Sequence, residues 1–170
     1  QDYIAADGTI FWDWADNNNY QHDIAGIGRD DCQKLNQKQS KSINGDDPLA
    51  IAVGDFTTLP TSNEANTATI ADDESFLVWS NNNGALTFTT PVPKVGINGT
   101  FHTIRKWRIS KTSFTDQMLT ISVGQSGERY LLVDEDGSGD FENDANTKEY
   151  AFDFTTGLLN INSLNLPDGA

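Results

Sequence analysis

The residues with the clearest chemical potential lie in the stretch DEDGSGDFENDA, which spans positions 134–145. Oxygen-bearing side chains stand two residues apart around two glycines: Asp134, Asp136, Ser138 and Asp140. When such a chain turns tightly, oxygens at alternate positions converge on one point, and calcium takes about six to eight oxygen ligands. The spacing therefore predicts a calcium site.

The last position of this loop differs from the common helix–loop–helix calcium site. It is Ala145, where that site has a glutamate that binds calcium through two oxygens. Both flanks, RYLLV and KEYAFDF, have strand character, so we expect the loop to close a β-hairpin, with Glu142 or Asp144 supplying the missing carboxylate. The alternative is a solvated acidic turn without an ion, although crowded carboxylates repel one another when no cation neutralises them. The predicted calcium ligands are Asp134, Asp136, Ser138, Asp140, Glu142 and Asp144.

A second distinctive segment is GIGRDDCQKLNQKQSKS at positions 26–42, which has almost no apolar side chains after its glycines. We expect it to form a long ordered polar loop. Arg29 can hold one neighbouring carboxylate through two hydrogen bonds, which would make the cluster structural. The alternative is functional: an aspartate binds a second cation, or the loop presents a polar face to a ligand. The candidate ligand-binding residues are Arg29, Asp30, Asp31, Gln37, Lys38 and Gln39.

Other reactive or aromatic side chains have simpler expected roles. Cys32 is the single cysteine and cannot form an internal disulfide, so we expect it to be buried and inert. The four tryptophans lie in apolar strand patterns, and alternation puts Trp12 and Trp14 on one face. This pattern favours core packing over stacking on sugars.

No combination of residues predicts an enzyme. His22, His102 and Cys32 supply bases and a thiol, but no nucleophile elbow, metalloprotease helix or phosphate-binding loop accompanies them. Carboxylate pairs for glycoside hydrolysis stay open as an alternative, because aspartate and glutamate are abundant. We therefore expect a binding module rather than a catalyst.

The composition narrows the range of partners. The 170 residues carry a formal net charge of −14, from 25 acidic and 11 basic side chains. Nucleic acid is disfavoured because its binding needs a cationic surface, and membrane insertion because no apolar run approaches the ~20 residues of a spanning helix. A salty, calcium-rich extracellular setting would screen and neutralise the charge. We expect a monomeric module of a longer protein that is secreted or on the bacterial cell surface.

The whole chain is typical of an all-β domain. Short runs rich in Val, Ile, Leu, Phe, Thr and Trp alternate with clusters of Gly, Asn, Asp and Pro. They predict a single domain over residues 1–170, a two-sheet antiparallel β-sandwich of jelly-roll-like form with long loops. Residues 61–74 lack a period, so we expect them to cross between the sheets. The predicted strands lie near residues 9–14, 49–54, 75–80, 85–90, 103–110, 118–124, 129–134, 150–155 and 158–164.

The segments IAGIGRDD, LNQKQS and LVDEDGSGDF follow one another in this order. In this respect nearly the whole chain resembles an uncharacterised domain of large secreted or surface proteins of bacteria. The resemblance implies an exported β-sandwich module, often carried beside lectin-like or adhesion domains, and it implies no particular ligand. Acidity and calcium loops also make the chain similar, more loosely, to the calcium-dependent ligand-binding modules of giant bacterial adhesins, which bind peptides or sugars.

These patterns together predict a calcium-stabilised extracellular ligand-binding module that serves in adhesion. Its expected cofactor is calcium, and its expected partner is an extracellular glycan or peptide, with neighbouring domains in the same chain. Two alternatives stay open. One is a carbohydrate-binding module attached to a polysaccharide-active enzyme, and the other is a structural spacer that binds nothing.

Overall fold

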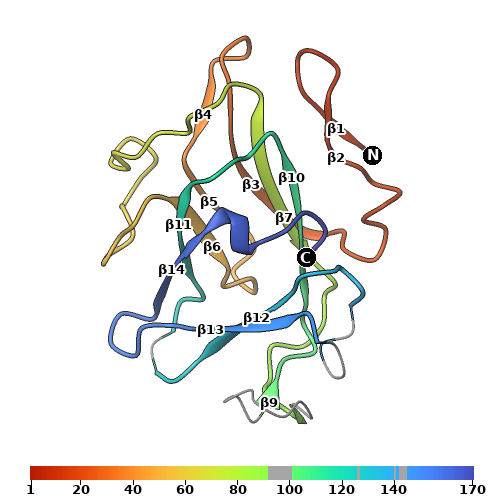
Figure 1. The fold of residues 1–170 in the computed structure, drawn as a ribbon, viewed down its shortest axis with the longest axis vertical. Coiled ribbons are helices and arrows are strands. Elements are labelled where there is room, and N and C mark those ends of the chain that lie inside the picture. Colours follow the sequence, from red (N-terminus) through yellow and green to blue (C-terminus); the bar gives the residue numbers. More distant parts are fainter. Residues whose placement is uncertain (92–100, 126, 140, 142–144) are drawn as a thin grey trace.

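The computed structural model describes residues 1–91, 101–125, 127–139, 141 and 145–170. The fold is all-β, as predicted (Figure 1). The helix in the described residues is the short 3₁₀ turn η1 (Ser163–Asn165), and none there has the length and apolar character needed to cross a membrane. The strands are β1 (Tyr3–Ile4), β2 (Ile10–Trp12), β3 (His22–Asp30), β4 (Leu35–Gln37), β5 (Gln39–Lys41), β6 (Ala50–Val53), β7 (Ser75–Asn81), β8 (Thr90–Pro91), β9 (Phe101–His102), β10 (Trp107–Thr112), β11 (Met118–Ser122), β12 (Tyr130–Asp134), β13 (Thr147–Ala151) and β14 (Leu158–Asn162).

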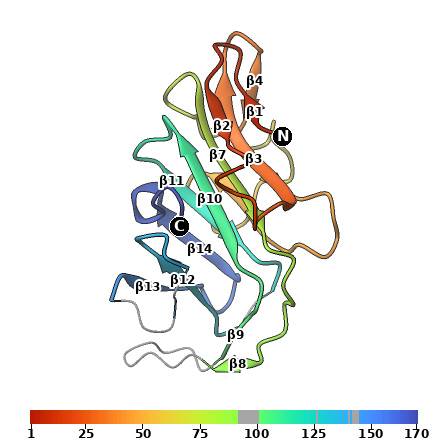
Figure 2. The same ribbon diagram turned by 90° about the vertical axis from the view of Figure 1, so that its right-hand side faces the viewer.

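Two four-stranded antiparallel sheets form the β-sandwich. The strand order is β10-β7-β3-β4 in the first sheet and β14-β11-β6-β5 in the second. Within the described residues, the hairpins β1-β2, β8-β9 and β12-β13 lie around the sandwich as separate two-stranded pairs (Figures 1 and 2). The predicted two-sheet antiparallel class is confirmed.

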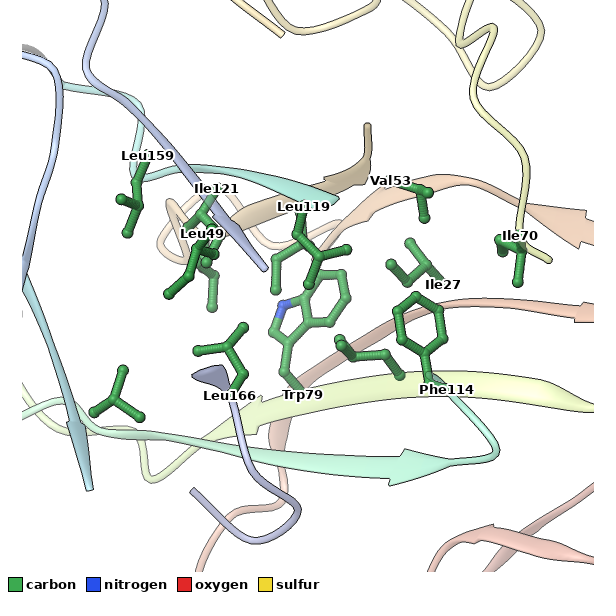
Figure 3. Close-up of a cluster of buried hydrophobic side chains, with 14 of the residues drawn as sticks. Ile27, Leu49, Val53, Ile70, Trp79, Phe114, Leu119, Ile121, Leu159 and Leu166 are labelled. Atoms are coloured by element: carbon green, nitrogen blue, oxygen red, sulfur yellow. The ribbon is translucent and has the colours of Figure 1, made fainter. Parts of the chain in front are cut away.

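The core lies between the inward faces of the two sheets. In the first sheet, the alternate residues Leu77 and Trp79 of β7 point inward together with Ile27 of β3. Figure 3 shows the fully buried Trp79 at the centre of the cluster. Because burying one large apolar side chain contributes roughly 1.5–3 kcal/mol, this cluster is the main source of stability. The second sheet contributes Ile51, Val53, Leu119, Ile121, Leu159 and Ile161.

The segment that follows β3 forms two edge strands, so the prediction of a polar loop is wrong. β4 pairs with β3 in the first sheet, whereas β5 pairs with β6 in the second. The chain changes sheets at Lys38, which lies between them. At this corner the Lys38 N–H donates to Asn63 Oδ1 at 2.7 Å, and the Lys38 carbonyl accepts from Val53 N at 2.8 Å. Polar side chains suit such a strand, because sheet edges face solvent.

The central strand β3 was missed by the sequence pattern because glycines interrupt it. β3 lies between β7 and β4, and the facing side chains occupy the space that the glycines leave. A Cβ atom on Gly28 would lie 2.6 Å from Phe76 Cδ1, and one on Gly26 would lie 3.1 Å from Val78 Cγ2. The glycines therefore serve close packing between two neighbouring strands.

The β1-β2 hairpin forms a third layer on the outer face of the first sheet. Phe11 stacks on Phe76 with ring centroids 4.3 Å apart, and Trp12 is fully buried as predicted. β7 consequently has both faces covered and is buried along its whole length. Trp14 is 40% exposed, so its predicted place in the core is wrong. The strand ends before it because the Asp13 carboxylate accepts backbone hydrogen bonds and starts a turn.

Two connecting segments differ in how well they were predicted. Residues 61–74 link β6 in the second sheet to β7 in the first without forming a strand, which confirms the predicted crossing loop. Residues 85–89 do not form the predicted strand. The Ala85 carbonyl accepts one hydrogen bond from Arg105 N at 3.0 Å, and no ladder extends from it through these residues.

Candidate functional site

A cavity of about 550 Å³ lies between the sandwich and the β12-β13 hairpin. We call it the pocket. In both ribbon views the hairpin lies between β14 and the β8-β9 hairpin (Figures 1 and 2). Small-molecule sites typically measure ~300–1,000 Å³ and have mostly apolar walls, and the pocket has both properties. Its apolar wall includes Ile51 and Ile121 of the second sheet, Trp107 and Ile109 of β10, and Leu131 and Phe152 of the hairpin region.

Basic side chains also line the pocket: Arg105, Lys106 and Arg129. The Arg105 guanidinium donates to two backbone carbonyls at 2.9 and 2.7 Å. Lys106 Nζ donates to the Gly139 carbonyl at 2.8 Å and lies 4.8 Å from the centre of the Phe141 ring. These partners are uncharged, so they hold Arg105 and Lys106 in place without cancelling their positive charges.

Two nitrogen atoms of pocket-lining residues, Arg129 Nε and His102 Nε2, are buried and have no hydrogen-bond partner among the described residues. The Arg129 guanidinium lies 5.4 Å from the centre of the Phe88 ring. His102 Nδ1 lies 2.7 Å from the Thr103 carbonyl, which can only accept, so Nδ1 carries a proton. Buried polar atoms are usually paired, and the two nitrogens therefore indicate where the polar part of a ligand would bind.

Asp47 fixes Trp107 in the pocket wall. The Asp47 side chain is buried and accepts hydrogen bonds from Trp107 Nε1 at 3.2 Å, Asn81 Nδ2 at 3.1 Å and Leu49 N at 3.2 Å. Burial raises the pKa of Asp47, and the hydrogen bonds partly oppose that rise. A buried carboxylate thus holds one wall of the pocket in place through three donors.

The acidic loop joins β12 to β13, as predicted. The Asp134 carboxylate accepts from Asp136 N at 3.3 Å and Gly139 N at 2.5 Å, and Asp136 accepts from Ser138 N at 3.0 Å. Gly137 and Gly139 have φ angles of 68° and 78°, which glycine adopts without strain. The hydrogen bonds and the glycines together curl the loop back on its first aspartate.

The two aspartates of this loop differ in their pKa. Burial raises the pKa of Asp134, whereas the backbone N–H of Ser138 lowers the pKa of Asp136 to about 2. The structure therefore brings together Asp134, Asp136 and Ser138 of the predicted calcium ligands. The other three, Asp140, Glu142 and Asp144, lie outside the described residues. Within the described part of the chain, no three His, Cys, Asp or Glu side chains form a cluster that could hold a metal.

Arg29 and Asp31 form the two-hydrogen-bond pair expected from the sequence. Arg29 Nε donates to Asp31 Oδ1 at 2.9 Å, and Nη2 donates to Oδ2 at 2.7 Å. This pairing lowers the pKa of Asp31. Nη1 donates to the carbonyls of Ile70 and Ala71, at 3.1 and 3.0 Å, and so ties the crossing loop to β3. Asp30 is buried and accepts a backbone hydrogen bond within the β3-β4 turn at 3.0 Å.

Lys38 and Gln39 attach residues 60–66 to the corner where the chain changes sheets, and Gln37 makes a hydrogen bond within that corner. Lys38 Nζ donates to the Asn66 carbonyl, Gln39 Nε2 donates to the Pro60 carbonyl at 3.0 Å, and Gln37 donates to the carbonyl of Gln39. Their donors are thus used within the fold. None of the six predicted ligand-binding residues is among those that line the pocket.

Cys32 is exposed, so the prediction that it is buried is wrong. It lies in the β3-β4 turn, where Lys34 N donates to the Asp31 carbonyl at 3.2 Å and residues 31–34 are all exposed. The β3-β4 turn projects beyond the end of the first sheet (Figure 1).

Sequence reasoning missed the pocket, because its walls come from segments that are distant in the sequence. No local sequence pattern connects β6, β10 and β12, and neither Arg129 nor His102 belongs to a motif that the sequence would reveal. One signal was present. The run YLLV in β12 has no polar alternation, and such runs are typical of strands that are covered on both faces. That pattern would have indicated a buried inner surface beneath the hairpin.

The comparisons with known proteins give one match. A family model described as a domain of unknown function (DUF8202) matches residues 1–170. No curated protein and no solved structure matches the chain significantly. Because the family model covers every residue of this sequence, the chain belongs to the DUF8202 family of domains.

Proposed function

We propose that this chain is an extracellular ligand-binding module of a bacterial surface or secreted protein, that it serves in adhesion without catalysis, and that the pocket is its binding site. The observation that carries the proposal is an apolar cavity of about 550 Å³ with the unpaired Arg129 Nε and His102 Nε2 in its wall. A largely apolar pocket with a few polar groups is the usual form of a small-ligand site. The net charge of −14 supports an extracellular setting rich in salt and calcium.

We expect the neutral apolar dye N-phenyl-1-naphthylamine to bind the pocket saturably, at one molecule per chain. Its fluorescence increases when it leaves water, so a fluorescence titration measures the affinity directly. Val123 lines the pocket, and Val123→Trp should weaken dye binding at least about tenfold because the indole takes up part of the cavity.

The matched control is Met118→Trp, which adds the same side chain at an exposed position of β11 away from the pocket. Met118→Trp should leave the affinity unchanged. Dye binding that never saturates, or that both variants weaken equally, would contradict the proposal that the pocket is the site.

We also propose that calcium binds the acidic loop and stabilises the module. The carboxylates of Asp134 and Asp136 lie in one tightly curled loop, and such loops direct oxygens at alternate positions toward a common point. With a dissociation constant of about 0.5 mM, calcium at about 5 mM would add ~1.4 kcal/mol of stability. We expect the melting temperature to rise by about 3 °C or more in calcium relative to chelator.

The Asp136→Asn variant should lose this calcium response. Asp153→Asn is the matched control, because the Asp153 carboxylate also accepts backbone hydrogen bonds in an exposed turn, at 3.0 and 2.7 Å, outside the acidic loop. If calcium and chelator give the same melting temperature for the native chain, and likewise for each variant, calcium does not contribute to the stability of the fold.

The alternative of a carbohydrate-binding module depends on a different surface. Tyr3 and Trp14 are 41% and 40% exposed and offer aromatic faces for stacking on sugar rings. Glycan-array binding that Trp14→Ala abolishes, in a protein that does not bind the dye, would favour this alternative over the pocket.

A further inference from the structure

We infer that the pocket selects a small apolar molecule carrying a carboxylate, and that Arg129 binds this carboxylate. The inference rests on the proposed function of the pocket and adds the chemical class of its ligand. Arg129 Nε is buried without a hydrogen-bond partner among the described residues, while its guanidinium lies beside the Phe88 ring at 5.4 Å. An N–H that has lost water without gaining an acceptor is costly, so the group that relieves it binds tightly.

The other unpaired atom supports the same ligand class. Since His102 Nδ1 donates to the Thr103 carbonyl, Nε2 is the ring atom left to meet a ligand. In the neutral imidazole Nε2 accepts from an O–H group, and in the imidazolium it donates to a carboxylate oxygen. A carboxylate can therefore accept from Arg129 Nε and from the imidazolium form of His102 at the same place.

Charge also favours an anion at this place. Three of the 11 basic residues of a chain with net charge −14 line the pocket: Arg105, Lys106 and Arg129. Two acidic residues, Glu128 and Asp134, are in the same described lining, so basic side chains outnumber acidic ones there. In a chain with 25 acidic and 11 basic side chains, the pocket is therefore less acidic than the rest of the protein and the more favourable place for an anion.

The size of the cavity and the polarity of its wall indicate the chemical nature of the rest of the ligand. A cavity of about 550 Å³ suits a small organic molecule, and its aliphatic and aromatic lining favours an alkyl or aryl body. A sugar would leave most of its hydroxyl groups without partners against such a wall, at a cost in free energy. The ligand class is thus an apolar organic acid, such as a medium-chain alkanoate.

The test compares decanoate with 1-decanol as competitors of N-phenyl-1-naphthylamine. The two competitors share one chain length, and their heads differ in charge. We expect Arg129→Gln to lower the affinity for decanoate about tenfold or more, because hydrogen bonds to charged groups are strong, and to lower the affinity for 1-decanol much less, so that the ratio of the two affinities falls. Arg129→Lys should retain part of the preference, since it keeps the charge but lacks the planar donor group.

Lys41→Gln is the control, because Lys41 is exposed on β5 outside the pocket and its loss changes the net charge equally. It should leave the ratio of decanoate to decanol affinities unchanged. Thermal melting shows whether each variant is folded, and Arg129→Met provides a second variant if Arg129→Gln is not. If the dye binds and the ratio is the same in the native chain and all variants, the carboxylate inference is overturned while the pocket stands. If the dye does not bind the native chain, the proposed function and this inference both fail.

Discussion

Replacing Asp47 with alanine is expected to lower the free energy of unfolding by about 3 kcal/mol or more, because a buried donor left without its acceptor costs ~1–3 kcal/mol. The substitution removes the acceptor of Trp107 Nε1, Asn81 Nδ2 and Leu49 N at once. Asn81 also donates to Asp23 at 2.8 Å and so keeps one partner. Urea unfolding measures the loss, and dye titration tests whether the pocket loosens when Trp107 is no longer held.

The control is the neighbouring Asp46→Ala. Asp46 is exposed. Its backbone carbonyl accepts from Arg105 at 2.7 Å, and the substitution by alanine keeps this carbonyl. The two variants remove the same charge from adjacent positions. Equal losses of stability would show that net charge, and not the buried hydrogen bonds of Asp47, accounts for the effect.

The effect of pH on Asp47 has a definite sign. Burial raises the pKa of Asp47 above its ordinary value of 3.8, so the folded chain binds this proton more tightly than the unfolded chain does. The ionisation of Asp47 therefore lowers stability as pH rises from about 3.8 through the raised pKa. Asparagine does not titrate. The stability advantage of the native chain over Asp47→Asn should accordingly be greatest in acid and become smaller toward neutral pH.

The second large effect is expected for Gly28→Ala, which should destabilise the fold by about 3 kcal/mol, the upper part of the range for overpacking. The added methyl group would lie 2.6 Å from Phe76 Cδ1 and 2.9 Å from the Ser75 carbonyl oxygen. Phe76 cannot easily move aside because its ring is stacked on Phe11 at 4.3 Å. The strain therefore falls on the pairing of β3 with β7.

Gly26→Ala is the matched control on the same strand. Its methyl group would lie 3.1 Å from Val78 Cγ2, the end of a side chain, and 3.3 Å from the Leu77 carbonyl oxygen. Small shifts relieve these contacts, so we expect a loss of about 1 kcal/mol or less. Urea unfolding of both variants gives the comparison. Equal losses of stability in the two variants would mean that a general effect of replacing glycine with alanine in a strand, and not the contacts with Phe76, determines the result.

The all-β class was predictable because its signal is local. The continuous apolar run in β7, the alternation in β11 and the turn residues between the runs are readable within short windows. The two edge strands β4 and β5 were not predictable in that way. They meet at Lys38, whose backbone makes hydrogen bonds with the Asn63 side chain and with Val53 N, and both partners lie far along the chain. A polar sequence at a sheet edge resembles a loop when such partners are not known.

The candidate sites also differ in whether the sequence could predict them. The pair of Arg29 with Asp31 was foreseeable because the partners lie two residues apart, and the hairpin position of the acidic loop followed from its flanks. The pocket was not foreseeable. Arg129 precedes β12 and His102 ends β9, and only the tertiary fold brings the two residues into the wall of one cavity.

The exposed Cys32 has a practical consequence for experiments on this domain. The β3-β4 turn that carries it lies at the opposite end of the long axis from the β8-β9 hairpin (Figures 1 and 2), and Phe101 and His102 of β9 line the pocket. Since it is the single thiol of the chain, a maleimide will attach at one defined point. A sensor surface coupled through Cys32 will hold every molecule by the same end, with the β8-β9 hairpin at the far end, and without any engineered substitution.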